Sequence, residues 1–109
     1  MPKRTIVGLI EEVKINGKQA KAKIDTGADK NSICLTLASK LNLYPSHKLA
    51  YVRSSQGKER RPVVWARLEI QGRKFKTRFN VADRRSMKYD VLIGKNILKR
   101  RFIIDPSKK

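Results

Sequence analysis

The chain has 109 residues, enough for one compact domain, and its hydrophobic share of 39% is that of an ordinary folded protein. Lys and Arg number 27 against 9 Asp and Glu, and the net charge of +18 favours an acidic partner such as nucleic acid or a glutamate-rich peptide. A single cysteine, Cys34, and a single histidine, His47, exclude an internal disulfide and the usual zinc sites, so we expect no metal and no cofactor.

The first predicted elements form a hairpin that delivers a carboxylate. Residues 6–15 read as a strand that runs into Asn16-Gly17, the strongest short signal for a β-hairpin. The next strand, residues 19–25, alternates polar and apolar side chains and ends at Asp25. The hairpin therefore places an acidic residue at a strand end, next to a glycine turn.

The middle of the chain predicts a short helix and a long hairpin. Apolar residues recur at helical spacing over residues 35–43, before the helix breaker Pro45. Residues 48–70 read as a hairpin with a polar tip at residues 53–58. We expect Cys34 to be a small buried residue, because lone cysteines outside electropositive pockets are usually inert. For Trp65 and Tyr51 we expect a place in the core or in the packing of the hairpin.

The last third predicts two more strands, a helix and a closing strand. Residues 73–81 alternate, and one face holds Phe75, Thr77, Phe79 and Val81. The apolar run 91–93 suits a strand that is buried on both faces. Residues 95–100 read as a short helix and residues 101–105 as a final strand. The sum is an all-β fold, a closed or partly open barrel with one or two short helices, in a single domain over residues 1–109.

The segment Asp25-Thr26-Gly27-Ala28 has the chemistry of an active site. A strand aims the carboxylate of Asp25 into a cleft, and Gly27 lets the chain turn tightly enough for two such loops to approach each other. Two carboxylates a few ångströms apart cannot both ionise, so they share one proton. The ionised member takes a proton from water, which attacks a peptide carbonyl, while the protonated member donates to the carbonyl oxygen.

Two segments together resemble the retropepsin family of aspartic proteases. Residues 24–29 resemble the catalytic loop of that family, and residues 91–98 resemble its second signature, in which two apolar residues and a glycine lead into a helix. The resemblance implies a retropepsin-like barrel with Asp25 as the catalytic residue and Thr26, Gly27 and Ala28 as its supporting loop. It also implies a structural pair between Asp29 and Lys95.

A narrower resemblance covers nearly the whole chain. Residues 53–57, 59–64 and 82–87 are similar to a retropepsin-like family labelled ATP-dependent zinc proteases, some of which accompany enzymes that ligate glutamate onto ribosomal proteins. The sequence supports neither part of that label, because it has too few metal ligands and no glycine-rich phosphate loop.

The short chain has only one Asp-Thr-Gly, so the pair of carboxylates, the catalytic dyad, requires a second copy of the chain. A two-fold homodimer is therefore the expected assembly. By resemblance, residues 2–8 and 101–106 should interleave with the same segments of the partner subunit. The predicted hairpin over residues 48–70 is the expected flap, and its tip is basic. Guanidinium groups pair well with carboxylates, so we hypothesise an acidic peptide or protein substrate. The residues expected to bind it are Arg53, Ser54, Ser55, Gln56, Gly57 and Arg61.

Two other functions remain open from the sequence. The chain could be a non-catalytic basic β-domain that binds RNA or an acidic protein, or a retropepsin fold without activity that serves as a dimerisation module. Aromatic residues make up only 6% of the chain, and Phe75 and Phe79 are expected to face away from the lysines of their strand, which weakens the case for base stacking. No apolar run approaches the about 20 residues of a membrane span and no signal peptide is evident, so we expect a cytoplasmic protein without membrane contact.

Overall fold

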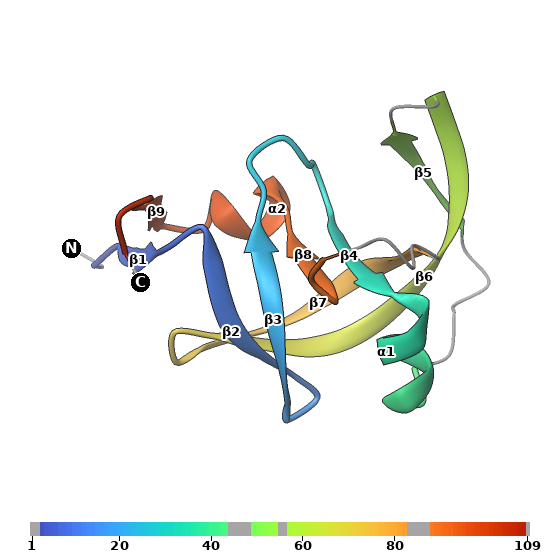
Figure 1. Cartoon of the computed structure of the whole chain (residues 1–109), viewed down its shortest axis with the longest axis horizontal. Coiled ribbons are helices and arrows are strands. Elements are labelled where there is room, and N and C mark those ends of the chain that lie inside the picture. The colour runs from blue at the N-terminus through green and yellow to red at the C-terminus, as the bar shows by residue number, and fades with distance from the viewer. Residues whose placement is uncertain (1–2, 44–48, 55–56, 83–87, 109) are drawn as a thin grey trace.

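The computed structural model describes residues 3–43, 49–54, 57–82 and 88–108, and for residues 49–54, 58 and 59 it describes the backbone alone. The described part contains nine strands and two short helices (Figure 1). In chain order they are β1 (Thr5–Val7), β2 (Ile10–Ile15), β3 (Lys18–Ile24), β4 (Asn31–Cys34), α1 (Leu35–Lys40), β5 (Leu49–Ser54), β6 (Gly57–Ile70), β7 (Arg73–Ala82), β8 (Val91–Ile93), α2 (Lys95–Leu98) and β9 (Phe102–Ile104).

Six strands close into a barrel, which confirms the predicted all-β fold. The strand order is β2-β3-β8-β4-β7-β6, and pairing of β2 with β6 closes the sheet. Strand β8 lies inside this order, parallel to β3 and antiparallel to β4, as its continuous apolar run predicts. Within the part of the chain that the structure describes, strand β5 pairs with β6 alone. The two form a hairpin that projects from the barrel at the same end as the loop after β3 (Figure 1).

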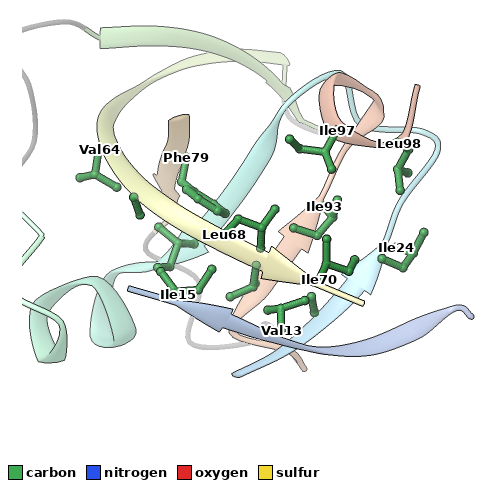
Figure 2. Packing of buried hydrophobic residues seen from close by; sticks show 14 of the residues in the cluster. Val13, Ile15, Ile24, Val64, Leu68, Ile70, Phe79, Ile93, Ile97 and Leu98 are labelled. Atoms are coloured by element: carbon green, nitrogen blue, oxygen red, sulfur yellow. The ribbon is translucent and has the colours of Figure 1, made fainter. Parts of the chain in front are cut away.

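The core fills the barrel with aliphatic side chains and one phenylalanine (Figure 2). Residues of β2 alternate between exposed and buried, so that Val13 and Ile15 point inward. Opposite them lie Leu68 from β6, Phe79 from β7 and Ile93 from β8, each less than 2% exposed. Burying one such side chain contributes about 1.5–3 kcal/mol. The single chain therefore has a complete core of its own.

The expected strand over residues 6–15 is wrong in one respect, because it is broken at Gly8 into β1 and β2. A Cβ atom at Gly8 would lie 2.8 Å from the carbonyl oxygen of Lys108, so only glycine fits where the C-terminal segment crosses. The Gly8 N–H donates to Oε2 of Glu11 over 2.6 Å instead of to a strand partner. The break turns the first residues away from the barrel.

The rest of the structure agrees with the sequence except in three respects. Strand β4 was not expected; it lies between β7 and β8 and has four buried residues. Trp65 is not in the core, because it lies on the outer face of β6 with 51% of its surface exposed. Both helices are shorter than expected, since α1 ends at Lys40 and α2 at Leu98.

The two ends of the chain form a separate two-stranded sheet. Strands β1 and β9 pair in parallel, with Ile6 opposite Ile103. We expected these ends to interleave with a partner subunit, and in the single chain they pair with each other. The inner face of this sheet packs on the barrel: Phe102 lies 6.1 Å from Phe75 between ring centroids, and the guanidinium of Arg73 lies 4.4 Å from the Phe102 ring. Neither strand has a second strand partner within the described residues.

Among the residues that the structure describes, no helix has the length and apolar character needed to cross a bilayer.

Candidate active site

Asp25 stands at the point where β3 leaves the barrel. Its backbone N–H donates to the carbonyl oxygen of Ile93 in β8 over 2.9 Å, which extends the pairing of β3 with β8 by one residue. The Ala28 N–H donates to the carbonyl oxygen of Asp25 over 3.3 Å and closes a tight turn. The backbone of the loop is thus fixed on both sides of the carboxylate.

The carboxylate itself is half-buried and is held by its own loop. The Gly27 N–H donates to Oδ1 of Asp25 over 2.9 Å, and a Cβ atom at Gly27 would lie 3.2 Å from the same oxygen. Thr26 and Gly27 are exposed, whereas Ala28 is half-buried. No hydrogen bond from the described residues reaches the second oxygen, Oδ2, which leaves one carboxylate oxygen available for a reacting group.

The second signature segment lies directly against this loop, as the resemblance implies. The Lys95 N–H donates to the carbonyl oxygen of Ala28 over 2.8 Å, and the Asn96 N–H donates to that of Asp29 over 3.2 Å. At Gly94 a Cβ atom would lie 2.5–2.8 Å from backbone atoms of Lys30. Any larger residue at position 94 would push the two segments apart, so glycine is required for the close approach.

The predicted contact between Lys95 and Asp29 is confirmed. Nζ of Lys95 lies 3.0 Å from Oδ1 of Asp29, with 55% and 82% of the two side chains exposed. Ion pairs as exposed as this one contribute little to stability, because water screens both charges. The backbone hydrogen bonds of the two segments, rather than this pair, hold the loop.

A buried polar network behind the loop was not anticipated from the sequence. Oδ1 of Asn31 accepts a hydrogen bond from the Gly94 N–H over 3.1 Å, and Nδ2 of Asn31 donates to the carbonyl oxygen of Arg78 over 3.2 Å. Asn80 donates through Nδ2 to the carbonyl oxygen of Asn31 over 2.7 Å and accepts at Oδ1 from Ser32 over 2.9 Å. Asn31 and Asn80 are 0% and 4% exposed. The network ties the strand after the Asp25 loop to β7 and to the start of α2.

The expected substrate-binding residues are placed in different ways. Arg61 is only 5% exposed, and its Nη1 donates to Oδ1 of Asn80 over 3.0 Å, so it supports the base of the hairpin instead of standing at an exposed tip. Gly57 is exposed and pairs with Ser54 across the hairpin, and Arg53 pairs with Lys58. The side chains of Arg53 and Ser54 are not described, and Ser55, Gln56 and His47 lie outside the described residues.

Cys34 is buried, as expected, and caps a helix. Its Sγ accepts a hydrogen bond from the Leu37 N–H over 3.4 Å and donates to Oδ1 of Asp90 over 3.4 Å. Burial raises the pKa of the Cys34 thiol, and the nearby Asp90 carboxylate raises it further. A thiol held in its neutral form is a poor nucleophile, so the arrangement serves structure. Within the described residues, no group of His, Cys, Asp or Glu gathers that could hold a metal ion.

Comparison with known proteins relates this geometry to a family. A family model described as the retropepsin-like aspartic endopeptidase RimB matches residues 44–109, which is 66 of the 109 residues. The match begins after the Asp-Thr-Gly loop. No curated protein matches the chain.

Solved structures share the fold over 83–96% of the chain. A Legionella pneumophila protein of unknown function has a TM-score of 0.71 at 20% identity and covers 96% of this chain and 95% of its own. The EIAV protease in complex with the inhibitor HBY-793 has a TM-score of 0.68 at 23% identity, over 92% of this chain and 89% of its own. The simian foamy virus (mac) protease has a TM-score of 0.63 at 18% identity, over 83% and 91%.

Proposed function

The chain belongs to the RimB-like family of retropepsin-like aspartic endopeptidases, and from this premise we propose that it hydrolyses peptide bonds as a homodimer in which each subunit contributes Asp25. The observation that carries the proposal is the Asp25 loop itself. Gly27 holds one oxygen of the carboxylate, and the loop rests on backbone hydrogen bonds to Ile93 and Lys95. This arrangement is half of a dyad, because one Asp-Thr-Gly supplies only one carboxylate.

In the proposed mechanism the two Asp25 carboxylates share one proton, since two negative charges so close together are unfavourable. The ionised carboxylate removes a proton from a water molecule, and the oxygen of that water bonds to the carbonyl carbon of the substrate. The protonated carboxylate gives its proton to the carbonyl oxygen. The carboxyl group that took the proton from water then passes it to the amide nitrogen, while the other carboxylate takes a proton from a hydroxyl of the tetrahedral intermediate. The C–N bond breaks, and an acid and an amine leave a dyad that again holds one proton. The Gly27 N–H donates to Oδ1 of Asp25 over 2.9 Å and keeps each carboxylate oriented.

An exposed apolar surface at the chain ends supports the dimer. Ile6 and Ile103 are opposite each other in the β1–β9 sheet and are 50% and 42% exposed. Leu9 and Ile10 follow β1 in the chain and are 49% and 37% exposed. We call these four residues the terminal patch. Large aliphatic side chains gathered in this way favour a partner that covers them, and a two-stranded sheet also offers two outer strand edges.

The terminal patch adjoins the catalytic loop. The carbonyl oxygen of Leu9 accepts a hydrogen bond from the Ile24 N–H over 2.9 Å, and Ile24 precedes Asp25. A second copy that covers the patch around a two-fold axis would bring its own loop toward the first. The two copies carry twice +18, a charge of about +36, which opposes association. Dimerisation should therefore strengthen as salt is added.

The first experiment replaces the proposed catalytic group. Asp25→Asn keeps the shape of the side chain but removes the base, so we expect peptide hydrolysis to fall by at least about a thousandfold with the fold unchanged by circular dichroism. The matched control is Asp29→Asn, which changes the same charge on a neighbouring exposed residue. Hydrolysis that survives in Asp25→Asn, or a wild-type protein that cleaves no peptide in any salt, would contradict the proposal.

We further propose that the substrate is an acidic, glutamate-rich peptide or protein. The net charge and the basic residues of the β5–β6 hairpin, of which Arg60 is exposed, support this choice. Cleavage of a glutamate-rich peptide should exceed that of a length-matched neutral peptide, chiefly through a lower KM, and the advantage should shrink as salt screens the charges. Equal rates for the two peptides would remove the substrate preference but leave the proposed chemistry intact.

A further inference from the structure

The outer face of β6 and β7 carries the only tryptophan of the chain among basic residues. Trp65 is 51% exposed, although it was expected in the core or in the packing of the hairpin. It lies opposite Arg78 across the two strands, and the guanidinium of Arg78 is 5.8 Å from the centroid of the indole ring. That distance is within the range of a cation–π contact. The indole is therefore a flat, solvent-facing platform beside a fixed positive charge.

The basic residues continue from Trp65 along the same face. Side chains two positions apart point to the same side of a strand, so Arg67 and its cross-strand partner Lys76 follow the Trp65–Arg78 pair. Both are exposed. The next pair consists of Glu69 and Lys74, and Lys14 of β2 lies opposite Glu69 on the other side. The face thus holds five cations, one carboxylate and one exposed aromatic ring.

Part of this face is hollowed into an open cleft of about 450 Å³. Its charged lining comes from the last two rows of the same face, and the turn after β2 closes one side. The lining includes Lys14, Asn16, Arg67, Glu69, Lys74 and Lys76. Together with Trp65 and Arg78, these residues form what we call the tryptophan face.

The cleft end of the tryptophan face is remote from the proposed active site. Asn16 is beyond the start of β3 and Asp25 is beyond its end, and a strand of seven residues spans roughly 20 Å (Figure 1). The face shares no residue with the terminal patch either. A ligand in the cleft would leave both the Asp25 loop and the terminal patch open.

We propose that the tryptophan face binds single-stranded nucleic acid, with the cations on phosphates and the indole of Trp65 stacked on a base. Single-strand binding sites combine a positively charged groove with an aromatic ring on which bases stack, and both parts occur here. An acidic peptide would also be attracted by Arg67, Lys74 and Lys76, but its carboxylates have no flat surface to place on the indole. The exposed ring therefore favours a base over a carboxylate.

The experiment uses Trp65 as its own reporter, because the chain has no other tryptophan. The full-length protein is titrated with single-stranded RNA of about 12 nucleotides, and tryptophan fluorescence and fluorescence anisotropy of the labelled RNA are both recorded. We expect RNA binding to quench Trp65. Polyphosphate and polyglutamate are the anionic controls, and they should leave the emission nearly unchanged.

Substitutions then separate stacking from charge. Trp65→Ala should weaken RNA binding by about fivefold or more without changing its salt dependence, and Trp65→Phe should restore most of the affinity because it keeps a ring. Lys76→Glu should weaken binding and lower the slope of log affinity against log salt by about 0.7 or more. Lys40→Glu, an equal charge change at an exposed position of α1, should have a much smaller effect.

Three results would overturn the proposal. The first is RNA that fails to bind at low salt. The second is RNA that binds without quenching Trp65 and with equal affinity for Trp65→Ala, which would indicate an unspecific attraction to the net charge. The third is polyglutamate that binds more tightly than RNA and depends on Lys76 but not on Trp65, which would assign the face to an acidic protein segment.

Discussion

The barrel and the two-stranded sheet of β1 and β9, here called the terminal sheet, differ in how far a single chain completes their hydrogen bonding and burial. The barrel closes its own hydrogen bonding through β2 and β6 and buries its inward side chains to less than 2% exposure at Ile15 and Phe79. The terminal sheet has only β1 and β9, and it leaves Ile6 and Ile103 in water. The barrel is a finished fold that presents the Asp25 loop at the end of β3. The terminal sheet is the unfinished part, and it lies next to that loop, because the carbonyl oxygen of Leu9 accepts a hydrogen bond from the Ile24 N–H.

The largest effect is expected from a substitution in the terminal sheet, and it should be seen in the dimer dissociation constant. Ile103→Lys places a charge on the outer face of β9, and in a two-fold interface the change occurs twice, so we expect the dimer dissociation constant to rise by about a hundredfold or more. Hydrolysis at low protein concentration should fall with it. Thermal unfolding of the isolated chain should change little, because Ile103 does not point into the core.

The matched control for this change is Leu35→Lys. Leu35 is 46% exposed, close to the 42% of Ile103, but it lies at the start of α1 and outside the terminal patch. Analytical ultracentrifugation of both variants across protein concentration measures the difference. Equal self-association of the two variants would show that the terminal patch is not where subunits meet.

A change inside the barrel should instead lower the stability of the single chain. Asn31→Ala removes the acceptor of the Gly94 N–H and the donor to the Arg78 carbonyl, which would leave buried polar groups without partners. We expect the free energy of unfolding to fall by about 2–4 kcal/mol, measured by urea titration. Asn96→Ala is the control, since Oδ1 of Asn96 is buried without a hydrogen bond from the described residues. A cost at Asn96 as large as that at Asn31 would contradict this role of the network.

A smaller effect is expected where the two parts are joined, at Glu11 of β2. Its carboxylate accepts hydrogen bonds from the Gly8 N–H and from Nε2 of Gln71, each over 2.6 Å, and lies 3.2 Å from Nζ of Lys108. Burial alone would raise the pKa of Glu11, but these partners hold it below its ordinary value of 4.5. A lowered pKa means that the carboxylate contributes stability above about pH 4.5, and that this contribution is lost as the pH falls through the folded-state pKa.

Glu11→Gln should therefore lower the free energy of unfolding by about 1–2 kcal/mol at neutral pH and flatten its dependence on pH in the acid range. Glu12→Gln, at the exposed neighbouring position of β2, should change neither. Urea titrations from about pH 3 to about pH 7 measure both quantities. An unchanged acid slope in Glu11→Gln would mean that Glu11 does not join the two parts.

The sequence predicts the barrel well where a residue pattern is typical of a single local structure. The Asn16-Gly17 turn, the alternation of β7 and the apolar run of β8 each correspond to a single local structure, and the structure has all three. The contact between Asp29 and Lys95 followed from a family resemblance and is present as well. Local signals and a motif pair were enough to position the Asp25 loop.

The sequence could not predict features that depend on distant partners. Asn31 and Asn80 look like surface residues of their strands, and only the crossing of β4, β7 and α2 gives them buried hydrogen bonds. Arg61 was expected in the flap, because the sequence does not show that Asn80 lies beside it. In the structure its guanidinium donates a hydrogen bond to Oδ1 of Asn80 and is buried. Trp65 is the reverse case, because a large aromatic ring is usually buried and here one faces water beside Arg78.

The central claim is that one catalytic unit needs two copies of Asp25, and subunit mixing tests it most directly. Wild-type protein is refolded together with an equal amount of Asp25→Asn, and hydrolysis per total protein is compared with that of wild type alone. A shared dyad predicts that mixed dimers are inactive, so activity falls to about a quarter, whereas independent sites predict a fall to about one half. A value of one half would contradict the shared dyad.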